Sequence, residues 1–321
     1  MLIKINNVKV PDDSGLFFCT KIMTPLKENS ISVAIQGGFG AFHEIAAKQF
    51  FGTIPIEIVP CETFTDLFNE LQDKKVDCGI VAMENSVAGS LLQNLNLLRE
   101  SGLSIMGEEY LRVVQNLIAL PGQSIDDIRE IHSHPIAIQQ CNVFLNQLRR
   151  KGVRIIDSAD TALSVKWIRD ENLMGIGALG SELAARMYNM EILKREVETN
   201  KRNFTRFQII TESDKVKELE QIANQTINKS TLCFSLHHEE GRLSQVLSVL
   251  SFYNMNLTKI QSLPIVGVEW EYFFYIDLVF RDFNRYQQAL EAVKPLTEQL
   301  QILGEYQNGQ RPSENKTIIE D

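Results

Sequence analysis

Two polar clusters in the sequence could bind an anionic substrate. The first, Glu84-Asn85-Ser86, begins one residue after the apolar run Cys78–Ala82 and continues to Gly89. Asn85 and Ser86 can donate hydrogen bonds to a carboxylate or an oxyanion without adding net charge. If the run is a strand, these side chains stand at its carboxyl end, where open α/β sheets bind ligands. The alternative is that the segment only caps a helix that begins near residue 91.

The second cluster is Asn203-Phe204-Thr205-Arg206-Phe207, at the start of another expected strand. Arg206 offers a planar pair of donors to a carboxylate, and Thr205 offers a hydroxyl beside it. Successive side chains of a regular strand point to opposite faces, so both can reach one ligand only if the strand begins irregularly. The alternative is that Arg206 forms a structural ion pair.

A glycine turn, Gly37-Gly38-Phe39-Gly40, lies between the expected strand Ile31–Ile35 and a helical pattern from Phe42 to Phe51. Backbone N–H groups of such a turn can bind an anion at a helix N-terminus. A tight turn with positive φ explains the same glycines equally well. The residues match neither the dinucleotide fingerprint nor the P-loop pattern.

No sequence pattern indicates a metal site or a catalytic triad. H-E-x-x-H, clustered metal ligands and G-x-S-x-G are all missing from the sequence, so we expect no metal and no cofactor. Ser133-His134-Pro135 and Asp160-Thr161 each precede a helical pattern, expected over 135–150 and 161–171, and we interpret both mainly as helix caps.

Strands and helices must position these clusters, and from residue 31 to 213 they alternate in the manner of an open α/β protein. About 180 residues exceed what one doubly wound unit requires, so we expect two lobes with a cleft. A polar linker at 214–229 marks a domain boundary. Residues 230–308 then follow the order βαββαβ, the ferredoxin-like plan. We expect residues 1–30 to be a poorly structured leader and 309–321 a mobile tail.

The charge and the cysteines restrict the function further. The 321 residues contain 32 Lys and Arg against 41 Asp and Glu, a formal charge of −9. Without a dense basic block, neither a nucleic acid nor a membrane surface is an expected partner, and no stretch reaches about 18 apolar residues. Five scattered cysteines predict neither disulfides nor a zinc site, which favours a cytoplasmic location.

Taken in order, the motifs resemble those of the prephenate dehydratase family with a C-terminal regulatory ACT domain. The similarity covers about residues 31–307 and is most specific in the Glu-Asn-Ser and Thr-Arg-Phe motifs. It implies a two-lobed catalytic domain similar to periplasmic binding proteins, at 31–213. It also implies decarboxylative dehydration of prephenate to phenylpyruvate without a cofactor, in phenylalanine biosynthesis. The chorismate mutase domain of many relatives is not expected in the leader.

The resemblance assigns roles to residues of both domains. In the catalytic domain, Thr205 and Glu84 are the expected catalytic residues, and the substrate-binding residues are Asn85, Ser86, Gly89, Arg206, Phe207, Gly37 and Gly40. Thr205 would hydrogen-bond the leaving hydroxyl, with Glu84 or water as the proton source. In the ACT domain at 230–308, the residues expected to bind the allosteric effector L-phenylalanine are Gly241, Leu243, Asn256, Leu257 and Thr258.

The sequence departs from the family pattern at three positions and leaves two alternative functions to be distinguished. Ala41 stands where many relatives have a hydroxyl residue, while Arg242 and Leu263 replace usual residues of the effector motifs. A residue as large as Arg242 at a close-packed effector turn is expected to weaken or retune phenylalanine binding. The alternatives are arogenate dehydratase, which performs the same elimination on the amino-acid analogue, and a non-catalytic amino-acid sensor. The resemblance also implies a homodimer or homotetramer.

Overall fold

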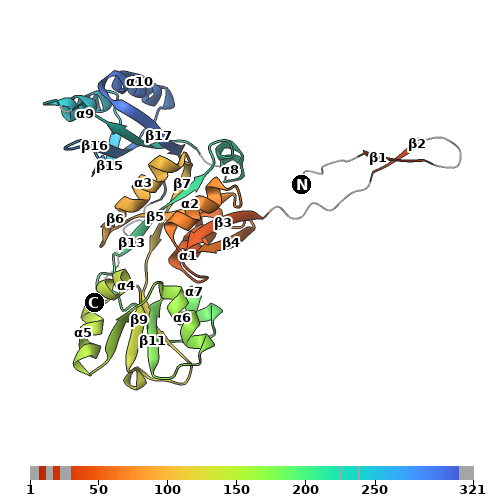
Figure 1. Ribbon diagram of the computed structural model, residues 1–321, viewed down its shortest axis with the longest axis vertical. Helices are drawn as coiled ribbons and strands as arrows, with labels where there is room; N and C mark the ends of the chain where they lie inside the picture. The colour runs from red at the N-terminus through yellow and green to blue at the C-terminus, as the bar shows by residue number, and fades with distance from the viewer. Residues whose placement is uncertain (1–6, 12–16, 22–29, 224–225, 238, 311–321) are drawn as a thin grey trace, which may run out of the picture.

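The protein consists of two lobes and a C-terminal domain arranged in a row, with lobe 1 in the middle (Figure 1). This arrangement is seen in a computed structural model, which describes residues 7–11, 17–21, 30–223, 226–237 and 239–310. The predicted α/β architecture with two lobes is confirmed. In the described part of the chain, no helix has the length and apolar character needed to cross a membrane.

Lobe 1 is a mixed sheet with helices on it. In spatial order its strands are β7 (Ser104–Arg112), β13 (Phe204–Thr211), β5 (Cys78–Asn85), β3 (Ile31–Gln36) and β4 (Ile56–Cys61), and the short β6 (Gly89–Ser90) pairs with β5. Its helices are α1 (Phe42–Phe51), α2 (Phe64–Gln72), α3 (Leu92–Ser101) and α8 (Val216–Ala223). Because β13 runs antiparallel between β5 and β7, it brings the two polar clusters of the sequence side by side.

Helix α2 illustrates how local sequence specifies these elements. Thr63 accepts a hydrogen bond from the Asp66 N–H, and the Asp66 carboxylate accepts one from the Thr63 N–H, which forms a capping box. The apolar side chains of Leu67, Phe68 and Leu71 recur three or four residues apart, so they lie on one face and are buried.

Lobe 2 is an insertion between β7 and β13. Its sheet has the order β10 (Arg154–Asp157), β9 (Glu130–Ser133), β11 (Ile176–Gly180), β8 (Asn116–Ala119) and β12 (Glu191–Lys194). Its helices are α4 (Pro135–Gln140), α5 (Asn142–Arg150), α6 (Thr161–Asp170), α7 (Glu182–Met187) and the short 3-10 helix η1 (Ile125–Asp127). The helix predicted over 135–150 is interrupted at Cys141, and β12 was not predicted.

The C-terminal domain has the predicted βαββαβ order. The elements are β14 (Lys229–Ser235), α9 (Arg242–Phe252), β15 (Asn256–Pro264), β16 (Tyr272–Val279), α10 (Phe283–Val293), the 3-10 helix η2 (Lys294–Leu296) and β17 (Glu298–Tyr306). Strand β17 pairs with β7 of lobe 1 at Gly304 and Ile105, so one sheet continues through both units. A side chain at Gly304 would lie 2.4 Å from the Ile105 carbonyl oxygen, so only glycine permits this pairing.

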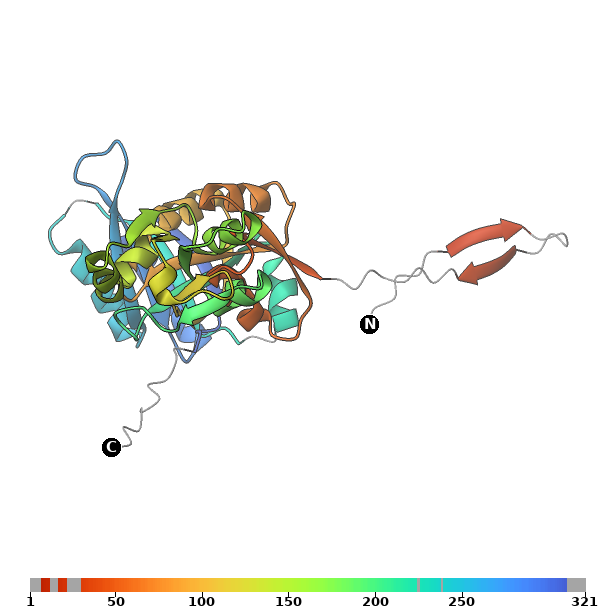
Figure 2. The ribbon, with the colours of Figure 1, turned by 90° about the horizontal axis from the view of Figure 1, so that it is seen from below.

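The N-terminal segment departs from the expected unstructured leader. Strands β1 (Asn7–Pro11) and β2 (Phe17–Lys21) form an antiparallel hairpin, which stands clear of the remaining elements in both views (Figures 1 and 2). Residues 1–6, 12–16 and 22–29 of that leader, and 311–321 of the predicted tail, lie outside the described residues.

Candidate active site

A cavity of about 450 Å³ lies between the two lobes, a volume typical of small-molecule sites. Lobe 1 contributes residues near the ends of its strands and the start of α1, and lobe 2 contributes the starts of α4 and α6. The polar lining is mainly uncharged, and the two acids, Glu62 and Asp160, are accompanied by no Lys or Arg among the described lining residues. Of the predicted site residues, the cavity brings together Asn85, Thr205 and Phe207.

Asn85 and Thr205 are paired in register on β5 and β13 and are joined by a hydrogen bond. The Asn85 Oδ1 atom accepts from the N–H groups of Val87 and Ala88, at 2.9 and 2.8 Å. These backbone donors fix the orientation of the amide, so Asn85 Nδ2 must be the donor to Thr205 Oγ1, at 3.0 Å. The hydroxyl hydrogen of Thr205 is therefore available for a ligand, since no described contact uses it.

Phe207 and His43 form an aromatic wall beside this pair. The His43 ring packs edge-on against Phe207 and Phe64, with centroid distances of 5.0 and 5.6 Å. Burial lowers the pKa of His43 to about 3, so the ring is neutral near pH 7. His43 was not predicted from the sequence, where a single histidine at the start of a helix gives no functional signal.

Lobe 2 reaches the pair through Gln140, at the end of α4. Its Nε2 atom lies 3.4 Å from Asn85 Oδ1 and 3.4 Å from Asn203 Oδ1, and all three side chains are buried. Asn203 Oδ1 also accepts from Asn85 Nδ2 at 2.8 Å. Sequence reasoning missed Gln140, because a polar residue in an amphipathic helix is normally taken to face solvent.

The glycine turn serves to bring the two lobes together. The N–H of Gly37 donates to the Cys61 carbonyl and that of Gly40 to Glu44 Oε2, at 2.9 and 2.7 Å. Neither N–H is free, so their predicted role in binding the substrate is not supported. Instead, Gly40 packs directly on Ala184 of lobe 2. The interpretation as a tight turn is correct for both, with φ of 95° and 88°.

We expect Gly40→Ala to destabilise the protein by about 1–3 kcal/mol and to lower kcat/KM, because a Cβ there would lie 2.7 Å from Ala184 Cα. Gly52→Ala is the matched control. Gly52 follows the last residue of α1 and also has a positive φ, 57°, but no atom lies within 4 Å of the added Cβ. Chemical denaturation and steady-state kinetics of both variants give the comparison. Equal effects of the two substitutions would contradict a role for close lobe contact.

Two motifs interpreted as caps have that role in the structure. The His134 side chain accepts from the Ile136 N–H with Pro135 in the first turn of α4, and Asp160 accepts from the Leu163 N–H at the start of α6. Both also line the cavity. The capping alternative for the first polar cluster is wrong, because the N-cap of α3 is Leu91 and makes no side-chain bond.

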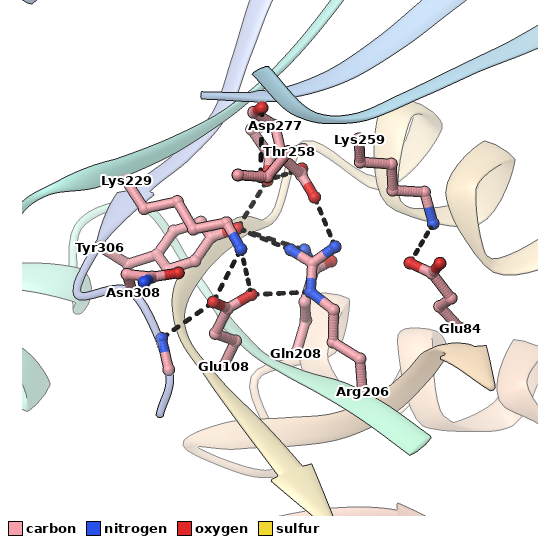
Figure 3. Close-up of polar contacts among 12 residues, drawn as sticks. Glu84, Glu108, Arg206, Gln208, Lys229, Thr258, Lys259, Asp277, Tyr306 and Asn308 are labelled. Carbon is pink, nitrogen blue, oxygen red and sulfur yellow. Dashed lines mark hydrogen bonds and ion pairs between the residues drawn. The ribbon is translucent and has the colours of Figure 1, made fainter. Parts of the chain in front are cut away.

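Arg206 does not reach the cavity and instead lies on the opposite face of β13. Its guanidinium pairs with Glu108 of β7, with Asp277 of β16 and with the Tyr306 hydroxyl of β17 (Figure 3). The register of β13 with β7 is unbroken from Phe204 to Ile209, so Thr205 and Arg206 face opposite sides. The predicted role of Arg206 in holding a substrate carboxylate is therefore corrected, and the alternative of a structural ion pair is right.

Glu84 and Ser86 likewise lie outside the cavity. Both line a second hollow of about 490 Å³ between lobe 1 and the C-terminal domain, together with Arg206. The Glu84 carboxylate pairs with Lys259, and Ser86 Oγ donates to the Arg202 carbonyl at 2.9 Å. This placement does not support direct roles for Glu84 and Ser86 at the substrate. Gly89 is exposed in β6 with φ 86° and is not among the cavity residues, although its neighbour Ala88 is.

The predicted effector residues occupy two separate places in the C-terminal domain. Gly241 and Leu243 lie at the start of α9, after the end of β14, whereas Asn256, Leu257 and Thr258 begin β15. Asn256 is aligned through β16 with Lys229, the first residue of β14. The two groups therefore lie toward opposite ends of the sheet within one chain.

A comparison with protein families decides the relationship of the chain. The family model for prephenate dehydratase matches residues 33–215, more than half of the sequence. The chain belongs to the prephenate dehydratase family. The match spans lobes 1 and 2 and therefore includes the cavity between them.

Similar proteins agree with this membership. The chain is 32% identical to a bifunctional chorismate mutase/prephenate dehydratase of Aquifex aeolicus, over 87% of this chain and 74% of that protein. A prephenate dehydratase from Arthrobacter aurescens, solved in complex with L-Phe, has the same fold, with a TM-score of 0.75 and 22% identity over 87% and 90% of the two chains.

A solved structure described as a novel type of quorum quenching acylase, GqqA, is also similar. It is 29% identical, with a TM-score of 0.74, over 86% of this chain and 97% of that one. Family membership is shown by the family model and by the Aquifex aeolicus relative, and relatives of similar fold carry different activities in their names.

Proposed function

We propose that the cavity between the lobes catalyses the decarboxylative dehydration of prephenate to phenylpyruvate. The observation that carries this proposal is the Thr205 hydroxyl, which accepts from Asn85 and keeps its own hydrogen free inside the cavity. That hydrogen can be donated to the hydroxyl group that leaves the substrate ring. Since a threonine hydroxyl is a very weak acid, it stabilises the leaving oxygen by a hydrogen bond, and water supplies the proton that completes the departing water molecule.

Uncharged donors suffice for this chemistry. Loss of a carboxylate as CO₂ together with the ring hydroxyl forms an aromatic ring, so the reaction is strongly favourable once the substrate is oriented. Among the described lining residues, the side-chain amides and His134 can donate hydrogen bonds, and α1 begins at the cavity with its positive dipole end. With Arg206 outside the cavity, these groups replace it as the proposed holders of the substrate carboxylates.

We further propose that L-phenylalanine regulates the enzyme through a C-terminal ACT domain. Support comes from the βαββαβ order and from the L-Phe complex of the Arthrobacter aurescens relative. Because the two groups of predicted effector residues lie toward opposite ends of one sheet, a single site containing both requires two copies of the chain. This favours a homodimer or a larger even assembly. The buried, unpaired cysteines of the described residues fit a cytoplasmic enzyme.

The purified chain should convert prephenate to phenylpyruvate, measured by the absorbance of the product in alkali, and L-phenylalanine should inhibit it and raise its melting temperature. Arogenate is assayed separately as the alternative substrate. An acyl-amide substrate tests for the acylase activity that the description of GqqA names. Turnover of arogenate alone would replace the proposed substrate. Binding of phenylalanine with no turnover would indicate a sensor instead.

A further inference from the structure

The two strands that carry the Asn85–Thr205 hydrogen bond are also held by the C-terminal domain. On β5, Asn85 faces the cavity and its neighbour Glu84 faces the second hollow; on β13, Thr205 faces the cavity and its neighbour Arg206 faces the second hollow. The register pairs Thr205 with Asn85 and Arg206 with Glu84. On each strand, therefore, one residue faces the catalytic cavity and its immediate neighbour faces the C-terminal domain.

Arg206 is held in a buried ionic cluster. Its Nε atom donates to Glu108 Oε2 at 2.7 Å, its Nη1 atom to Asp277, and its Nη2 atom to the Tyr306 hydroxyl at 3.0 Å. Lys229 Nζ donates to both oxygens of Glu108, at 2.7 and 2.9 Å. Two positive and two negative side chains are thus neutralised together, and Asp277, Tyr306 and Lys229 belong to the C-terminal domain (Figure 3).

Glu84 is held by a second ion pair from the same domain. Lys259 Nζ, on β15, lies 2.9 Å from Glu84 Oε2 and 3.1 Å from Ser90 Oγ. The Lys259 side chain is only 11% exposed, while that of Glu84 is 41% exposed. Lys259 directly follows Thr258, whose hydroxyl donates to the Asp277 carbonyl at 3.3 Å, so both ion pairs originate from adjoining positions of β15 and β16.

We propose that Lys259 and Asp277 position the Asn85–Thr205 pair, because they hold Glu84 and Arg206, the next residues along the same strands. The proposal rests on the proposed function only in taking Thr205 as the group that acts on the substrate. It assigns Glu84 as a positioning residue rather than a proton donor. A ligand that binds at the start of β15 would then act on the cavity through these two ion pairs.

The most informative variants are Lys259→Met, Glu84→Gln and the two combined. Met retains the length and the apolar contacts of the Lys259 stem, and the half-exposed Glu84 carboxylate can be solvated when its partner is lost. We expect kcat of Lys259→Met to fall about 3- to 30-fold, the size of effect typical of coupling between two sites. We expect its KM to change less than twofold. The melting temperature should change little.

The double variant separates positioning from direct catalysis. If Glu84 acts through Lys259, Glu84→Gln has no further effect on kcat in the Lys259→Met background. If Glu84 donates a proton to the substrate, Glu84→Gln lowers kcat by the same factor in both backgrounds, which overturns the assignment. The matched control is Lys151→Met, which removes an exposed ion pair with Asp126 in lobe 2, with side chains 64% and 83% exposed, and should retain wild-type kcat.

Amide hydrogen exchange tests the same proposal without any substrate. In the ligand-free full-length protein, exchange at residues 83–86 and 204–207 should be faster in Lys259→Met than in the wild type, and unchanged in Lys151→Met. Wild-type exchange at both segments in Lys259→Met would overturn the proposal, whether or not prephenate is turned over. Absence of turnover by the wild type, with faster exchange in the variant, would instead reject the proposed function and retain the positioning.

Discussion

Thr205→Val is expected to lower kcat about 10²–10³-fold, the usual effect of removing one hydrogen-bond donor to a developing negative oxygen, with KM changed by less than a factor of about three. The two side chains have nearly the same shape, but valine has no hydroxyl. The effect falls on kcat because the donated bond strengthens as the C–O bond of the substrate breaks. Steady-state kinetics with prephenate gives both constants.

The local structure should survive this substitution. Asn85 Nδ2 carries two hydrogens and keeps two acceptors, Asn203 Oδ1 at 2.8 Å and the Phe204 carbonyl at 3.3 Å, so no buried donor is left without a partner. Thr205→Ser is the control, since it restores the hydroxyl and should recover most of the wild-type kcat. A Thr205→Val enzyme with near-normal kcat would mean that another group assists the leaving hydroxyl.

Arg206→Met is expected to be the most destabilising of these substitutions, by about 3–5 kcal/mol in the free energy of unfolding. It leaves the Glu108 and Asp277 carboxylates buried with only Lys229 to balance them. Urea denaturation measures the change. In the control Arg186→Met, only an exposed pair with Glu182 is lost, and the stability should hardly change.

The pH dependence of this loss has a defined sign. Burial by itself would raise the pKa of Asp277, but the charges of Arg206 and Lys229 hold it below the ordinary value of 3.8. This carboxylate therefore stabilises the wild type above about pH 4 and loses that effect as the pH falls through its lowered pKa. Without Arg206 its pKa rises, because burial is less compensated. The difference in stability between wild type and variant should then be smaller at pH 5 than at pH 7.5, and a larger difference at pH 5 would contradict this account.

Much of the fold was predictable because local patterns specify it. The helix predicted from Phe42 to Phe51 has those bounds in the structure, and the predicted βαββαβ order is also found. At one failure the chain makes tertiary contacts: the Thr199 N–H donates to the Gln140 carbonyl, and the Val143 N–H donates to Thr199 Oγ1. The helix expected over 135–150 is interrupted at Cys141, and no local pattern marked that position.

The candidate site was predictable only in part. Alternation along β13 already required Thr205 and Arg206 to face opposite sides. A substrate-binding role for Arg206 needed an irregular start of the strand, whereas β13 pairs with β7 in unbroken register from Phe204 to Ile209. One further signal was present: Asp277 stands alone in the otherwise apolar run Tyr272–Phe280, and a buried carboxylate requires a positive partner. The sequence could not say that this partner is Arg206, 71 residues away.

The sequence alone determined the family motifs, the α/β class and the presence of both Asn85 and Thr205, because these depend on residue identity and on the periodicity of strands and helices. The tertiary structure decided which face of each strand meets the cavity and which meets the C-terminal domain. That division depends on what packs against the sheet from distant parts of the chain. The same five-residue motif therefore supplies a cavity hydroxyl and, one residue later, a buried ion pair to another domain.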